Sequence, residues 1–448
     1  MDLFTLPPLR AFALMDLNYA SMGHNCGFLH KGSFPRRQSD SDLALVSDDF
    51  AQPLPQTRFN SAALPTPTEM VANSWRGGET HHRVGQTRGG QWWWFDPVDG
   101  ARVIAGVQGV NRSLSAAPIW PQLQEWGFNL LGFDAAEGVR NCGAAFLQAL
   151  ELRRATGYPI YQDGVNLPDV FDRRWEGLGE QLVNGVRPTA SLAGYLGDSA
   201  LSWGDAAVEG VALARPALLQ VCLSLDPSYA AYHAAWEFVF AERAGKLTRL
   251  NTDWGMALPN KEALRQMTRE ETPIDTPGYR VDLDRFTRQM ALRYFGAVSR
   301  ILRAVDPGRL WLSSPLARTT PVAVREIAAQ HCDVSLVTEV GLSEGIGPEL
   351  LVEVDWARAR GLRSEMDPVG MGDFERMIWR GRESLLSAIR APQVVGYIWG
   401  HYGAGDWGRD GAFTSGLLDE AGRINQAHVP ALQAINGVAA AVRAEAAG

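Results

Sequence analysis

Eight short apolar runs alternate along this 448-residue chain with longer stretches of helical periodicity. The longer stretches repeat apolar residues every three to four positions, as in residues 143–157, 284–306 and 374–391, and some of them end at glycine. Buried parallel strands read as continuous apolar runs because other elements cover both of their faces. The pattern predicts a (β/α)8 barrel with strands at residues 102–110, 128–134, 158–165, 191–198, 309–316, 333–340, 361–367 and 394–402.

A doubly wound open sheet would also alternate strands with helices. Such sheets usually carry a GxGxxG or GxxxxGK[ST] loop after the first strand, and neither pattern follows residues 102–110. The sequence therefore favours the closed TIM barrel over the open sheet.

Two further segments are expected around this barrel. Residues 1–85 are rich in Pro, Ser and Asn and show no sustained hydrophobic period, which predicts an irregular N-terminal segment. This segment is expected to pack on the barrel of residues 86–448. It could also reach a neighbouring subunit in a homo-oligomer. Residues 205–308, after the fourth strand, are too long for one helix. An insertion of this size is expected at the catalytic face, where it would shape a substrate cleft.

The charge and cysteine content restrict the function. Lys and Arg number 42 against 50 Asp and Glu, the net charge is −8, and the basic residues are scattered, so neither nucleic acid nor a membrane surface is an expected partner. Four distant cysteines without metal-ligand spacing give no indication of zinc or of a disulfide framework. No signal peptide or apolar span is visible, which predicts a cytoplasmic protein, or a secreted one if an export signal has been trimmed off. The 15 Trp residues suit the apolar faces of sugar rings.

Polar side chains stand at the carboxyl ends of the predicted strands, where barrel enzymes place their functional groups. Carboxylates, amides and imidazole together suit a polyol, because each hydroxyl both donates and accepts. For Asp134 and Asp163, capping of the next helix is an equally good interpretation. The set comprises Asn111, Asp134, Asp163, Asp198, Thr338, Glu339, Glu365, Asp367, Trp399 and His401.

Seven motifs in order, from residue 87 to the C-terminus, resemble glycoside hydrolase family 50, the β-agarase family of retaining (β/α)8 glycosidases. They are GGQWWWFDPVDG leading to GVQGVN, WGFNLLGF, AGYLGDSALSWG, LTRLNTDWG, DPGRLWL, GLRSEMDPVG and VVGYIWGHYGAGDWGRDG. The resemblance implies an oligosaccharide substrate with β-linked galactose, no cofactor or metal, and Glu365 as the nucleophile. It adds Ser199, Trp203, Asn251 and Trp254 to the expected substrate-binding residues. A structural ion pair is the alternative role for Glu365.

Ala200 stands where the family carries its acid/base Glu. Asp198, Leu201 and Trp203 match the surrounding motif, whereas Ser199 replaces an Asn that contacts the sugar. Loss of a positioned general acid costs about 10² to 10⁴ in rate. Three explanations remain open: substitution of a parental Glu to trap substrate, a natural glycan-binding pseudoenzyme, or proton transfer by another carboxylate such as Asp198 or Glu339.

Overall fold

Eight parallel strands form the central sheet, in the order β11-β9-β6-β5-β4-β14-β13-β12. The computed structural model describes residues 64–98, 100–110, 118–208, 210–270, 272–356, 372–403, 416–419 and 421–446. Isolated parallel bridges, Leu312 to Val334 and Leu316 to Val337, join the two end strands, so the sheet closes on itself. The (β/α)8 barrel is thereby confirmed. Its strands are β4 (Ile104–Val107), β5 (Leu130–Leu131), β6 (Phe146–Ala149), β9 (Leu192–Leu196), β11 (Leu310–Leu312), β12 (Ser335–Val337), β13 (Glu349–Val354) and β14 (Val394–Trp399).

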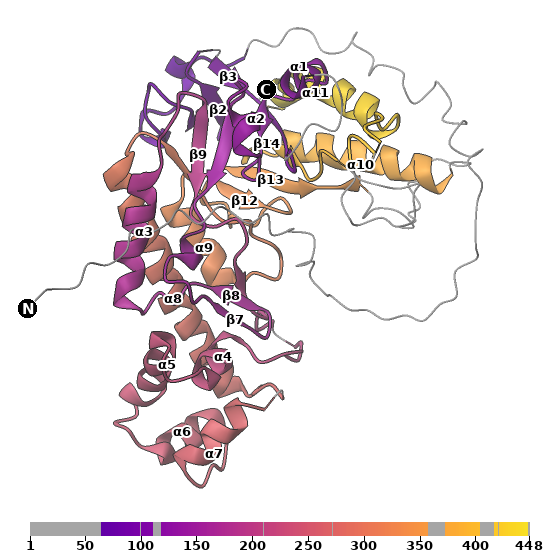
Figure 1. Cartoon of the computed structure of the whole chain (residues 1–448). Coiled ribbons are helices and arrows are strands. Elements are labelled where there is room, and N and C mark those ends of the chain that lie inside the picture. Colours follow the sequence, from indigo (N-terminus) through magenta and orange to yellow (C-terminus); the bar gives the residue numbers. More distant parts are fainter. Residues whose placement is uncertain are drawn as a thin grey trace, which may run out of the picture.

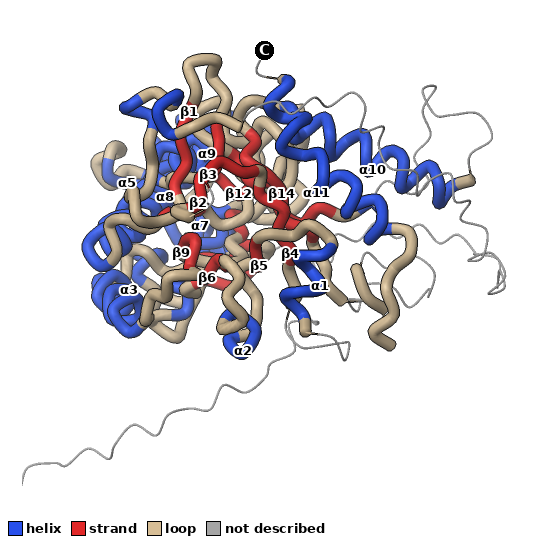
Figure 2. The backbone as a smooth tube through the Cα atoms, turned by 90° about the horizontal axis from the view of Figure 1, so that it is seen from above, coloured by secondary structure: helices blue, strands red, loops and turns tan. Residues whose placement is uncertain are grey.

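Helices lie outside the strands (Figure 2). Those that connect or follow barrel strands are α1 (Ile119–Glu125), α2 (Glu137–Arg140), α3 (Arg173–Gly185), α8 (Pro277–Val305), α9 (Val322–His331), α10 (Asp373–Arg390) and α11 (His428–Glu445). A short 3-10 turn, η7 (Leu152–Arg154), follows β6, and the described loop between β12 and β13 contains no helix. In the part of the chain that the structure describes, no helix combines the length and the apolarity needed to cross a membrane.

Helix α8 illustrates how the sequence determines an element. It begins with Pro277 at its first position, and the Thr276 side chain accepts a hydrogen bond from the Tyr279 N–H at 3.3 Å. Its buried positions include Tyr279, Leu283, Phe286 and Met290, which recur every three to four residues and form one stripe. This stripe is what the sequence predicted for residues 284–306, and the helix extends it by two turns toward the N-terminus.

The insertion after β9 forms a helical extension of the barrel. It consists of α4 (Leu218–Ser224), α5 (Ala230–Ala241), α6 (Leu247–Trp254) and α7 (Lys261–Thr268), after which α8 returns to β11. Figure 1 shows these helices gathered at the end of α8 that lies away from the barrel strands. The predicted insertion is therefore a set of helices beyond the barrel strands.

A small antiparallel sheet closes the other end of the barrel. It contains β1 (Arg83–Gln86), β2 (Trp92–Asp96) and β3 (Gly100–Arg102), preceded by the 3-10 turns η5 (Pro67–Glu69) and η6 (Ala72–Ser74). Trp92 and Trp94 belong to the same buried cluster as the strand residues Ile104 and Leu312, while Trp93 points to the outer core. Of the predicted N-terminal segment, residues 64–85 lie within the described chain and residues 1–63 outside it.

One predicted barrel strand was wrong. Residues 158–165 form no barrel strand: β7 (Ile160–Gln162) and β8 (Val165–Leu167) make an antiparallel hairpin in a separate sheet with β10 (Ser202–Trp203). The third barrel strand is β6, inside the segment predicted as a helix at 143–157. The reason is local, because Asp163 and Gly164 both have positive φ, 50° and 82°, and so turn the chain back on itself.

The seventh strand is β13, which pairs with β12 on one side and β14 on the other. Residues 361–367, where the sequence predicted this strand, lie outside the described residues. The run ELLVEV of β13 is continuous and apolar apart from its glutamates, and Pro348 precedes it. The shift moves the rim position of strand seven from the neighbourhood of Glu365 to the neighbourhood of Glu353.

Candidate functional site

The loop after strand four is held by the carboxylate of Asp198. This side chain is fully buried and accepts hydrogen bonds from the Arg153 N–H at 2.8 Å and from the Tyr294 hydroxyl at 2.6 Å. The ring of Tyr294 is itself buried in the core, with its centroid 5.9 Å from that of Trp175. Asp198 thus fixes the position of the next two residues and does not face solvent, where a substrate would bind.

Burial raises the pKa of Asp198 to about 7, because desolvation outweighs the hydrogen bonds from Tyr294 and Arg153, which lower it. In the unfolded chain the pKa is about 3.9, so between about pH 4 and pH 7 the native state keeps a proton that the unfolded state has released. The free energy of unfolding contributed by this group therefore falls as the pH rises through this window and levels off above it.

Replacing Asp198 by Asn is expected to remove this pH dependence, because the amide resembles the protonated acid. Urea unfolding of both proteins at several pH values between about 5 and 8 measures the effect. The unmodified chain should lose stability relative to Asp198→Asn as the pH rises to about 7. Parallel stability curves would mean that the carboxyl group is not protonated in the native state.

Glu151, just after strand three, faces the same loop. Its carboxylate accepts hydrogen bonds from the Ser199 N–H at 3.2 Å and from the Ser199 hydroxyl, and it pairs with Arg153 at 3.0 Å. Glu151 has a φ of 56°, a left-handed conformation that costs free energy in a residue with a side chain. The Ser199 hydroxyl therefore points to a protein carboxylate.

Ala200 is exposed, and its backbone is held from two sides. Its carbonyl accepts hydrogen bonds from Arg153 Nη1 at 2.6 Å and from Asn166 Nδ2 at 3.2 Å. A methyl group cannot give or take a proton. The structure thus combines a rigid backbone at the end of strand four with a side chain that has no acid/base chemistry.

Glu353 stands at the end of strand seven, on the same rim. It has a φ of 54°, its residue is exposed, and the register of β13 against β14 shifts between Leu351 and Val354. Bulges and left-handed non-glycine residues next to a rim often aim a functional side chain. A carboxylate of this kind can act as a nucleophile toward an anomeric carbon. Glu365, the residue indicated by the sequence, lies outside the described residues, as does Asn111.

The remaining predicted residues of the rim differ in their surroundings. Asp134 follows β5 and accepts the Gly109 N–H with both oxygens, at 2.9 and 3.0 Å. Glu339 follows β12 and pairs with Arg318 at 2.5 Å. His401, two residues after β14, is half-buried. These three lie near strand ends, as expected.

Other predicted residues lie away from the rim surface. Trp399 is fully buried at the end of β14, with its ring centroid 5.1 Å from that of Trp356. Trp203 is buried on β10 against Phe295, with the two rings stacked. Asp163 is exposed in the turn between β7 and β8 and not at the end of a barrel strand. Core packing accounts for both indoles in the structure.

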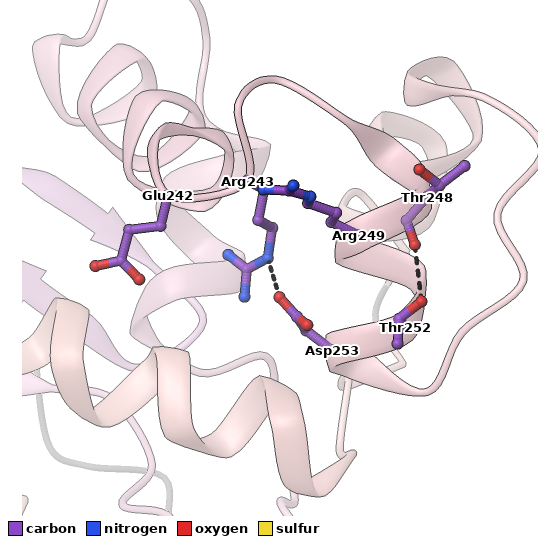
Figure 3. Close-up of a pocket in the computed structure, with 6 residues that line it drawn as sticks. All are labelled: Glu242, Arg243, Thr248, Arg249, Thr252 and Asp253. Atoms are coloured by element: carbon purple, nitrogen blue, oxygen red, sulfur yellow. Dashed lines mark hydrogen bonds and ion pairs between the residues drawn. The ribbon is translucent and has the colours of Figure 1, made fainter.

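Asn251 and Trp254 belong to α6 in the helical extension. The Asn251 side chain donates a hydrogen bond to the Leu258 carbonyl and accepts one from the Leu258 N–H. The buried Trp254 indole donates to the Asp282 carboxylate at 2.8 Å. A cavity of about 520 Å³ lies nearby (Figure 3), where Arg243 pairs with Asp253 at 2.7 Å. Its other lining residues are Glu242, Thr248, Arg249 and Thr252. These residues belong to the helical extension and not to the barrel rim.

Glu151 and Glu353 are the carboxylates that the sequence interpretation missed. A signal existed for Glu353, because GPELLVEV contains an apolar run directly before a glutamate. Glu151 carried no comparable signal, since the strand before it, FLQA, is short and lies among residues that favour helices.

Comparison with solved structures shows the same fold in three glycoside hydrolase structures. An exo-β-agarase aligns with a TM-score of 0.62 and 14% identity over 90% of this chain and 70% of its own. The agarase AgWH50C has a TM-score of 0.61 and 15% identity, covering 92% and 72%. BpGH50 has a TM-score of 0.57 and 15% identity, covering 88% of each chain. No family model and no curated protein matches the sequence. The resemblance to family 50 is thus confirmed at the level of the fold.

Proposed function

We propose that the chain carries the site of a retaining glycoside hydrolase for oligosaccharides with β-linked galactose, in which the acid/base position is occupied by Ala200. The observation that supports this most directly is the exposed Ala200, held on a rigid loop after strand four, on the same rim as a strained glutamate, Glu353, at the end of strand seven. Retaining glycosidases need one carboxyl group from each of two such positions, roughly 5 to 5.5 Å apart.

In the proposed mechanism a carboxylate of strand seven attacks the anomeric carbon, and the bond to the leaving-group oxygen breaks. We propose Glu353 in this role in preference to Glu365, because β13 is the seventh strand and Glu353 lies at its end. Position 200 would then supply a proton to the leaving oxygen and remove one from the attacking water. With alanine there, both proton transfers lose their group, and bound substrate turns over slowly.

Replacement of the missing acid by a neighbouring carboxylate receives little support. Asp198 is buried and already accepts two hydrogen bonds. Glu339 is paired with Arg318, and Glu151 is paired with Arg153 and Ser199. The parental Glu and the glycan-binding pseudoenzyme therefore remain the two explanations of Ala200. The second candidate function, glycan binding without turnover, rests on the missing proton donor.

A substrate that needs no protonation tests the proposal on the chain as it stands. With dinitrophenyl β-galactoside, azide is expected to raise turnover by about 10² or more, because the small anion replaces the water that position 200 can no longer activate. The product should be β-galactosyl azide with retained configuration, identified by NMR. An α-azide would contradict the double displacement, and binding of galactosides without any azide product would favour the binding protein.

A further inference from the structure

A three-stranded antiparallel sheet lies next to position 200, and its strand β10 begins two residues after Ala200. Strand β10 pairs with β8, and β8 pairs with β7, in an antiparallel arrangement that Figure 1 shows between the barrel and helices α4–α7. In the register of this sheet, Ser202 lies opposite Asn166, and Asn166 lies opposite Tyr161. These three residues form one row across the sheet, which we call the Tyr161 row.

The two faces of this sheet have different environments. Directly opposed residues of antiparallel strands project to the same face. One face carries the buried pairs Ile160 with Leu167 and Val165 with Trp203, which attach the sheet to the core. The Tyr161 row must therefore lie on the other face, and Tyr161 there is 65% exposed.

The Tyr161 row connects directly to the acid/base position. Asn166, in the middle of the row, donates its side-chain N–H to the Ala200 carbonyl at 3.2 Å. Neighbouring strands lie about 4.8 Å apart, so the backbone of Tyr161 is roughly 10 Å from that of Ser202. The row thus leads from position 200 outward to an aromatic ring over a distance comparable with one or two sugar units.

We propose that the Tyr161 row binds the sugar units on the leaving-group side of the scissile bond, with the Tyr161 ring as their stacking platform. The proposal rests on the proposed function, because the acid/base group acts on the leaving-group oxygen and so marks that side of the site. A tyrosine ring packs on the apolar face of a sugar and loses little conformational entropy on binding. The polar neighbours Asn166 and Ser202 suit the hydroxyl groups at the ring edges.

The test compares two substrates in the Ala200→Glu background. Tyr161→Ala is expected to lower kcat/KM for agaro-hexaose by about three- to tenfold, mainly through KM, because stacking contributes roughly 0.5–1.5 kcal/mol. The same variant should leave kcat/KM for β-galactosyl fluoride unchanged, since fluoride places no sugar on the row. Tyr161→Phe keeps the ring and should behave like the parent with both substrates.

Tyr158→Ala is the matched control, because Tyr158 is 71% exposed on the same arm of the hairpin but lies outside the paired row. Tyr158→Ala should leave kcat/KM unchanged for both substrates. Unchanged hexaose kinetics in Tyr161→Ala would overturn the proposal, and so would an equal loss with the fluoride, which would indicate a general disturbance of the site.

A binding measurement separates this proposal from the proposed function. If Ala200→Glu hydrolyses neither substrate, the assignment of the catalytic site fails. Calorimetric titration of agaro-hexaose into the unmodified chain and into Tyr161→Ala then decides the second question alone. A three- to tenfold weaker Kd in the variant is expected. Equal affinities, or no binding to either protein, would overturn the role of Tyr161.

Discussion

Ala200→Glu should raise kcat/KM for agaro-hexaose by about two orders of magnitude or more over the unmodified chain. The new carboxyl group would protonate the glycosidic oxygen as the bond breaks and then activate water for the second step. Position 200 is exposed, and its backbone contacts run through the carbonyl, so a longer side chain displaces no buried group. Initial rates from reducing-end release measure the effect.

Ala200→Gln is the matched control for this gain, because it has nearly the same shape as Glu and carries no transferable proton. Its rate should remain at the level of the unmodified chain. Equal rates for the Glu and Gln variants would exclude position 200 as the acid/base site.

Glu353→Gln, introduced together with Ala200→Glu, should abolish the restored hydrolysis, with a loss of about three orders of magnitude or more. An amide cannot form the glycosyl-enzyme, and no other group in the proposed mechanism replaces it. The change keeps the size of the side chain and the left-handed backbone at this position. Thermal unfolding of the variant should therefore match that of the parent, which separates lost chemistry from lost folding.

Glu365→Gln in the same background distinguishes the two candidate nucleophiles. With Glu353 as the nucleophile, Glu365→Gln should keep hydrolysis within about tenfold of the parent, whatever its effect on substrate binding. The reverse pattern, with activity lost only in Glu365→Gln, would return the nucleophile to the residue that the family motif indicates. Trapping with a dinitrophenyl fluorosugar and peptide mapping would identify the labelled carboxylate directly.

The barrel could be predicted because six of its eight strands are apolar runs in the expected places. The prediction of the third strand failed because β6 has only four residues and lies among Ala, Leu, Gln and Glu, which favour helices. Pairing with distant strands makes this segment a strand nevertheless. Asp-Gly is a typical hairpin turn, so the Asp163-Gly164 pair could have identified YPIYQDGV as part of a hairpin and not as a barrel strand.

A motif could be placed on the barrel from the sequence where it lay directly after a correctly predicted strand. Ala200 follows β9, and the loop around it could be located from the sequence. Glu353 was not singled out because the sequence placed the seventh strand at residues 361–367, whereas β13 covers Glu349–Val354. Trp203 and Trp399 were expected at the rim from their positions at strand ends. Their burial depends on long-range partners, Phe295 and Trp356, which no local pattern reveals.

The sheet β1-β2-β3 has a consequence for protein engineering. A chimera joined at the predicted boundary, between residues 85 and 86, would put Arg83, Val84 and Gly85 on one parent and their partners Phe95, Trp94 and Trp93 on the other. Because Trp94 sits in the cluster that fills the barrel, the junction would transmit any mismatch into the interior. The smallest portable unit of this barrel therefore starts upstream of Arg83, and the sheet β1-β2-β3 must be exchanged together with the barrel strands.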